Sequence, residues 1–87
     1  METTRQQIYD FVLSIAQQKG VADIGAGEEL TLSGIIDSLA IFRLVSFLEE
    51  TFGIRIADDE IVNENFASVD AIEALVNGKL ERRSATR

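Results

Sequence analysis

Residues 37–53, DSLAIFRLVSFLEETFG, decide the fold of this chain. Their apolar residues recur at the three- and four-residue spacing of an α-helix, which we expect to run from about Ser38 to Phe52. Asp37 occupies the N-cap position and Gly53 the terminating position. One predicted face carries Leu39, Phe42, Val45, Leu48 and Phe52, and Ile41, Leu44 and Phe47 widen it. A helix this apolar in an 87-residue chain is predicted to be central and packed on several sides.

Helical patterns also lie on both sides of this segment. Residues 4–19 predict an amphipathic helix ended by Gly20, whose inward face is Ile8, Phe11, Val12, Ile15 and Ala16. The acids of ADDEIV at 57–62 suit the first turn of a brief helix that stops before the polar NEN. Ser68 is predicted to cap a last helix that ends before Gly78 and points Val69, Ile72, Leu75 and Val76 inward. The predicted fold class is all-α, a small bundle of three to four helices.

The connection between the first two helices is unusually long. Residues 20–36 contain several glycines and no sustained helical period, which predicts a loop. So long a loop in a small domain is either functional or disordered. Its apolar members predict that it is pinned to the core, and they are Ile24, Leu30, Leu32, Ile35 and Ile36.

Composition argues against a self-contained enzyme. A chain of 87 residues buries only about 60 to 65% of its surface, so a deep cleft would consume core that the fold needs. The sequence contains no cysteine and no histidine, which removes thiolate nucleophiles, imidazole bases and the usual zinc ligands. Catalysis would need paired carboxylates in a dry pocket, whereas the acids fall mainly on predicted helix ends and polar faces. We therefore expect no enzyme activity and no metal site.

The net charge of −7 is unevenly distributed. Residues 79–87, KLERRSATR, hold four of the eight basic residues, and residues 1–78 carry about −10. We predict a domain over 1–78 and a basic, flexible tail over 79–87. The acidic surface disfavours nucleic acid and suits basic patches on proteins, although the acids are equally explained as solubilising charge. No apolar run approaches the roughly 20 residues of a membrane span, so we expect a soluble, cytoplasmic protein.

Ser38 admits two interpretations. The N-terminus of a helix presents unpaired N–H groups and the positive end of the helix dipole, which suit an anion such as a phosphodiester on this serine. The competing interpretation is that Ser38 merely begins the helix and Asp37 caps it. Local pattern alone favours the second.

The residues around Ser38 form a longer motif. Residues 34–39, GIIDSL, place Asp-Ser-Leu at the start of the central helix, and the flanks continue through Leu44-Val45, LEETFGI at 48–54 and IADDE at 56–60. Over the whole domain the chain resembles the acyl carrier protein and peptidyl carrier family, in which Asp-Ser-Leu opens the second helix. Three residues alone are a weak signal, but their position between these flanks makes the resemblance specific.

The resemblance implies a carrier fold and a function for Ser38. It implies that Ser38 bears 4'-phosphopantetheine, which a separate phosphopantetheinyl transferase attaches from coenzyme A with magnesium. Asp37 would cap the helix and help the transferase to place its metal, and Leu39 would be a partner contact or a core residue. The arm would hold an acyl or aminoacyl thioester for ligases, synthases or transferases of fatty-acid, other lipid, polyketide or specialised biosynthesis. We expect a monomer.

Departures from the family pattern bear on the partners. Fatty-acid carriers place acids early in the second helix, where this chain has Ala40, Arg43 and Ser46. The bulky Ile35-Ile36 before Asp37 is more typical of stand-alone carriers of specialised pathways. The candidate partner contacts are Arg43, Asp58, Asp59 and Glu60, although a helix start explains the three acids equally well. The alternative function is a small acidic helical adaptor without a prosthetic group, in which Ser38 stays unmodified.

Overall fold

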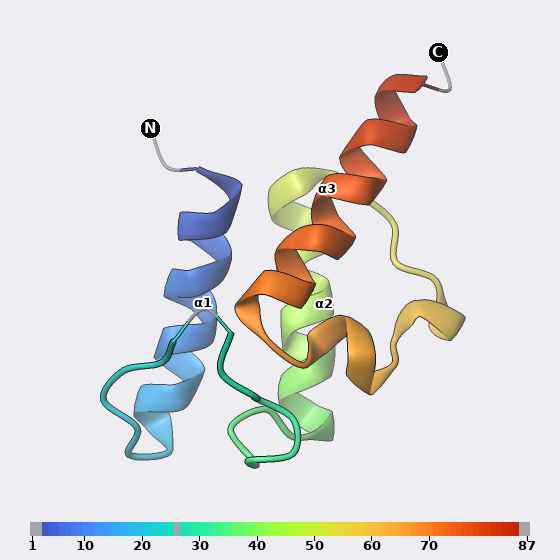
Figure 1. Cartoon of the computed structure of the whole chain (residues 1–87). Helices are drawn as coiled ribbons and strands as arrows, with labels where there is room; N and C mark the ends of the chain where they lie inside the picture. The colour runs from blue at the N-terminus through green and yellow to red at the C-terminus, as the bar shows by residue number, and fades with distance from the viewer. Residues whose placement is uncertain (1–2, 26, 86–87) are drawn as a thin grey trace.

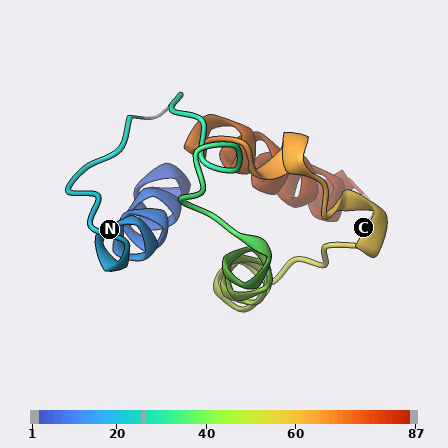
Figure 2. The same ribbon diagram turned by 90° about the horizontal axis from the view of Figure 1, so that it is seen from below.

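The computed structural model describes residues 3–25 and 27–85. This part of the chain forms three α-helices and contains no strand. The elements are α1 (Thr4–Gln18), α2 (Ser38–Phe52), the 3-10 turns η1 (Asp58–Glu60) and η2 (Asn63–Phe66), and α3 (Val69–Ala85). Each helix contacts the other two, and Figure 2 shows their arrangement from below. The radius of gyration, 12.5 Å, is close to the roughly 12 Å expected of a folded chain this long. The predicted all-α class and small bundle are confirmed.

The two ends of α2 form as the sequence predicts. The Asp37 Oδ1 atom accepts a hydrogen bond of 2.9 Å from the Ala40 amide, which satisfies one of the unpaired donors of the first turn. Gly53 ends the helix in the left-handed region at φ 66°, and its amide donates to the Glu49 carbonyl over 3.0 Å. A residue with a Cβ is strained at this φ, which is why glycine stands there.

The loop between α1 and α2 is ordered by contacts with the core. Ile24, Leu30, Ile35 and Ile36 are buried as expected. The Leu30 amide donates to the Ala67 carbonyl over 2.7 Å, which ties the loop to the start of α3. In Figure 1 the loop crosses one end of the bundle and delivers the chain to α2 there.

Leu32 departs from the expected burial, because 84% of it is exposed. Residues 31–34 form a turn, and the Glu29 carboxylate accepts hydrogen bonds from the amides of Thr31 and Leu32. Leu32 lies in this turn and is left in solvent. The prediction that Leu32 pins the loop is therefore wrong.

The expected brief helix at 57–62 is also wrong in extent. Two separate 3-10 turns replace it, and the NEN segment belongs to the second of them. The Glu60 carboxylate accepts from the Ala57 amide over 2.8 Å and closes the first turn. The second turn places Phe66 in the core with no exposed surface, and burial of this ring gives a physical reason for the second turn.

Helix α3 begins as predicted but ends later. The Ser68 hydroxyl accepts from the Ala71 amide over 3.1 Å, which confirms the cap. The helix then passes through Gly78 and continues to Ala85, so the predicted end at Gly78 is wrong. Beyond Gly78, Lys79 pairs with Glu60 and Leu80 packs partly against the core. These contacts offset the cost of a glycine inside a helix. The functional division of the chain at residue 78 stays a prediction.

The core is apolar throughout the described residues, with no buried polar side chain. The Arg5 guanidinium joins α1 to α3 at its rim, where it pairs with Asp70 at 2.6 Å and with Glu73. Helix α2 buries Ala40, Leu44, Val45 and Leu48, whereas Leu39 is 73% exposed and Phe42 is 61% exposed. The predicted apolar face is therefore not buried at Leu39 or at Phe42, and the expected core position of Phe42 is wrong. The apolar residues of α2 span a wider arc than its two neighbouring helices cover.

Candidate functional site

Ser38 is the first residue of α2 and is exposed. Asp37 before it is extended, with φ −97° and ψ −176°, so the chain enters the helix abruptly at the serine. Among the described residues, no hydrogen bond to the Ser38 hydroxyl is found. Ser38 lies at the end of α2 that is opposite the start of α1 and the end of α3 (Figure 1). Its hydroxyl is accessible to another protein.

Lys19 is the member of this site that sequence reasoning missed. Its Nζ atom donates to the Asp37 Oδ2 atom and to the Gly34 carbonyl, each over 3.0 Å. Lys19 follows the last residue of α1, so this ammonium group links the end of α1 to the start of α2. The only sequence signal is a cation at the end of a predicted helix. Asp37, the partner of Lys19, lies 18 residues away in the sequence, and a local sequence pattern does not predict a contact over that separation.

Both oxygens of the Asp37 carboxylate accept a hydrogen bond within the chain. Oδ1 accepts from the Ala40 amide and Oδ2 from Lys19. The Ala40 amide, followed by Lys19, lowers the pKa of Asp37 below its usual value, because each favours the charged form. Asp37 is thus an ionised cap, and its lowered pKa makes it a weak base beside Ser38.

The exposed residues of the first half of α2 fall on one stripe. They are Ser38, Leu39, Phe42, Arg43 and Ser46. Positions separated by three and four residues lie on the same face of a helix, so this set is contiguous. Leu39, for which the sequence left a contact role and a core role open, is exposed. Arg43 lies on the same stripe and pairs with no carboxylate in the part of the chain that the structure describes.

The three acids predicted as partner contacts lie on a different element. Asp58 and Asp59 are exposed on η1, which follows α2 along the chain. Glu60 is half-buried and is already engaged by Lys79 and by the Ala57 amide. Lys79, the stronger influence, lowers the pKa of Glu60. Glu60 therefore has a structural role inside the chain.

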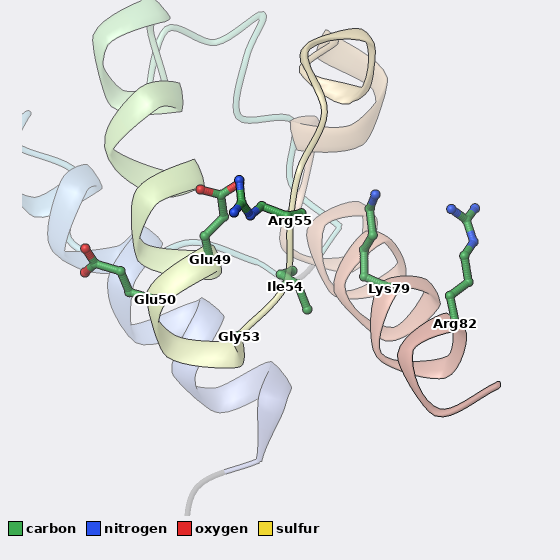
Figure 3. Close-up of a pocket in the computed structure, with 7 residues that line it drawn as sticks. All are labelled: Glu49, Glu50, Gly53, Ile54, Arg55, Lys79 and Arg82. Atoms are coloured by element: carbon green, nitrogen blue, oxygen red, sulfur yellow. The ribbon is translucent and has the colours of Figure 1, made fainter. Parts of the chain in front are cut away.

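A hollow of about 650 Å³ lies near the opposite end of α2 from Ser38. It is lined by Glu49, Glu50, Gly53, Ile54, Arg55, Lys79 and Arg82. In Figure 3 the two glutamates stand on α2, and Lys79 and Arg82 stand on α3 across the hollow. The hollow and Ser38 are separate places. We assign the candidate site to Ser38, because attachment of a group needs an accessible hydroxyl and does not need an enclosed cavity.

Within residues 3–25 and 27–85, no group of three or more acidic side chains is placed to hold a metal ion. In the same ranges, no helix has the length and apolar character needed to cross a bilayer. Comparison with known proteins gives no match for the chain, either to a protein-family model or to a curated sequence.

Proposed function

We propose that this protein is a carrier that holds an acyl or aminoacyl group as a thioester on a 4'-phosphopantetheine arm attached to Ser38. The observation that carries the proposal is an exposed serine at the first position of α2, directly after a capping aspartate and inside the segment GIIDSL. The order of elements supports a carrier-like bundle, because a long ordered loop leads from α1 to Ser38 and short turns separate α2 from α3.

The surroundings of Ser38 suit a phosphodiester. The first-turn amides of α2 and the positive end of its dipole favour negative charge there. The exposed hydroxyl leaves room for a long substituent. When bound, the arm supplies a terminal thiol, which this cysteine-free chain lacks, for the thioester with the cargo. Ser38 would hold the arm through its Oγ atom, and Asp37 would keep the start of the helix in place.

Attachment requires a separate enzyme under this proposal. Ser38 Oγ forms a bond to the phosphorus of the pantetheine phosphate in coenzyme A, and the bond to adenosine 3',5'-bisphosphate breaks. The hydroxyl proton goes to a base of the phosphopantetheinyl transferase, because the lowered pKa of Asp37 makes its carboxylate a poor proton acceptor. The transferase supplies magnesium, and Asp37 contributes to placing it. The carrier is a substrate in this step and not an enzyme.

The partners that follow are enzymes that load and use the thioester. We propose a dedicated ligase, synthase or transferase of a specialised pathway, acting on a monomeric, cytoplasmic carrier. The support is the absence of acids from the first half of α2, where Arg43 and Ser46 are exposed. Fatty-acid carriers are expected to present carboxylates at these positions.

The alternative is an adaptor without a prosthetic group, which the exposed apolar side chains of Leu39 and Phe42 would also serve. Intact-protein mass spectrometry separates the two. The protein is incubated with coenzyme A, magnesium and a broad-specificity phosphopantetheinyl transferase. We expect one phosphopantetheine on wild type and on Ser46→Ala, an exposed serine of the same stripe, and none on Ser38→Ala. A folded wild type that gains no mass with several transferases contradicts the carrier proposal and supports the adaptor.

A further inference from the structure

The hollow between the end of α2 and the end of α3 (Figure 3) gathers positive charge on an acidic protein. Three of the eight basic residues of the chain line it, whereas the net charge of the whole protein is −7. We call these three side chains, Arg55, Lys79 and Arg82, the basic rim. Lys79 and Arg82 are three residues apart on α3 and lie on one face of that helix. The rim exists because α3 continues through Gly78, where the sequence predicted the start of a flexible tail.

Two of the three cations keep their donors available. Lys79 is engaged by Glu60. Arg55 and Arg82 are exposed, and neither forms an ion pair with an acid of residues 3–25 or 27–85. At longer range, Arg82 adds a minor attraction that lowers the pKa of Glu60. A guanidinium presents a planar fork of N–H donors that matches a carboxylate through two parallel hydrogen bonds. Arg55 and Arg82 can therefore bind carboxylates from outside the chain.

The acids around the hollow decide which kind of anion fits. The Glu49 Oε2 atom accepts from the Ile56 amide over 2.9 Å, and Glu50 points away from α3 in Figure 3. Together with Glu60, these carboxylates repel a compact group that carries several negative charges, such as a diphosphate. Single carboxylates spread along a peptide reach one guanidinium each and stay apart from these acids. The hollow therefore suits an acidic peptide segment better than a small polyanion.

We propose that the basic rim binds an acidic segment of a partner protein, with one carboxylate on Arg55 and another on Arg82. This site does not depend on the proposed attachment of an arm to Ser38. Helix α2 has 15 residues and spans about 22 Å, so a segment bound at the hollow leaves the serine accessible. The partner holds the protein by one end while other enzymes reach the opposite end. The contacts are exposed ion pairs, so the association is weak and falls with salt.

The probe is a blocked hexapeptide with two glutamates, AEAAEA, and its neutral counterpart AQAAQA is the control. Each is titrated into the nitrogen-labelled full chain at about 100 mM salt, which screens the net charge beyond about 10 Å but not a direct contact. Amide NMR spectra give the Kd, locate the site and report whether each variant is folded. Arg55→Gln and Arg82→Gln each remove a proposed contact. Arg43→Gln is the matched control, because Arg43 is an exposed cation outside the hollow and its replacement changes the net charge equally.

We expect AEAAEA to shift the amides of residues 53–55 and 79–82, and AQAAQA to shift none of them. Arg55→Gln and Arg82→Gln are each expected to raise the Kd about threefold, and Arg43→Gln is expected to change it by less than about 1.5-fold. An equal effect of Arg43→Gln overturns the proposal, because attraction to the net charge then explains the binding. Tighter binding of diphosphate than of AEAAEA at the same amides overturns it as well, because the hollow is then a site for small polyanions.

This proposal and the carrier function fail separately. The double variant Arg55→Gln with Arg82→Gln is expected to gain phosphopantetheine within about twofold of the wild-type rate, because distant sites act independently. Loss of both peptide binding and modification in this variant overturns the separation of the two sites. Wild type that gains phosphopantetheine but shows no shift with AEAAEA overturns the peptide site alone. Wild type that binds AEAAEA at the basic rim but is never modified overturns the carrier function alone.

Discussion

The loop between α1 and α2 depends on Leu30, and replacing this residue tests how the molecule holds its candidate site. Leu30 has no exposed surface. Its amide donates to Ala67 over 2.7 Å, and its carbonyl accepts from Ile36 over 3.0 Å, close to the start of α2. The side chain thus anchors a loop that leads directly to Ser38. Leu32, two residues further on, is 84% exposed and gives a matched control in the same loop.

The expected effect of Leu30→Ala follows from burial. Three buried carbon atoms are lost, and at about 0.8 kcal/mol each the transfer cost is about 2.4 kcal/mol. The cavity left behind raises the total to about 3 kcal/mol, within the usual range for Leu→Ala in a core. A domain of this size is stable by roughly 5 to 15 kcal/mol, so the variant stays folded at 25 °C across this range. Its melting temperature falls by roughly 12 to 24 °C.

The assay is urea unfolding followed by circular dichroism at 222 nm, on wild type, Leu30→Ala and Leu32→Ala. We expect Leu32→Ala to lie within about 0.5 kcal/mol of wild type, because its side chain makes no buried contact. If Leu30→Ala costs less than about 1 kcal/mol, the loop is not anchored through this residue. Equal destabilisation by the two variants would refute the distinction between a buried and an exposed leucine.

Two further predictions concern the end of α3 and the stability in acid. Gly78→Ala is expected to stabilise the protein by about 0.5 to 1 kcal/mol in urea unfolding, because Gly78 lies inside a helix with open space around it. The control is Gly53→Ala, at φ 66°, which is expected to destabilise the protein by about 1 kcal/mol. If Gly78→Ala also destabilises the protein, α3 ends at Gly78 and the expected helix beyond it is wrong. Lys79 lowers the pKa of Glu60 below its ordinary 4.5, so this pair stabilises the protein above that pH and its contribution is lost as the pH falls through the lower folded value. We expect the free energy of unfolding in urea to fall less between pH 7 and pH 3 in Lys79→Met than in wild type. An equal decrease in both proteins would show that the pair does not contribute to stability.

The sequence predicts what is decided locally. Asp37 and Gly53 mark both ends of α2, because a cap needs only a side-chain acceptor near the first amides, and a left-handed end needs only a residue without a Cβ. Ser68 follows the same rule at the start of α3. The exposed position of Ser38 follows from its place directly after the cap.

Features that depend on distant residues could not be predicted in this way. Lys19 reaches Asp37 only because the loop folds back across the bundle. Phe42 fits the apolar period of α2, yet it is exposed because two neighbouring helices do not cover the whole apolar arc. Gly78 has the local signature of a helix end, and Lys79, paired with Glu60 from another element, is among the contacts that let the helix continue.

The central claim is that one specific hydroxyl accepts the phosphopantetheine arm, and peptide mapping by mass spectrometry tests it most directly. Trypsin cleaves after Lys19 and Arg43 and releases residues 20–43 as one peptide, which carries the hydroxyls of Thr31, Ser33 and Ser38. After incubation with coenzyme A, magnesium and the transferase, we expect the added mass on this peptide, with fragment ions that locate it on Ser38. Addition at Thr31 or Ser33, or an unmodified peptide from folded protein, would contradict the account.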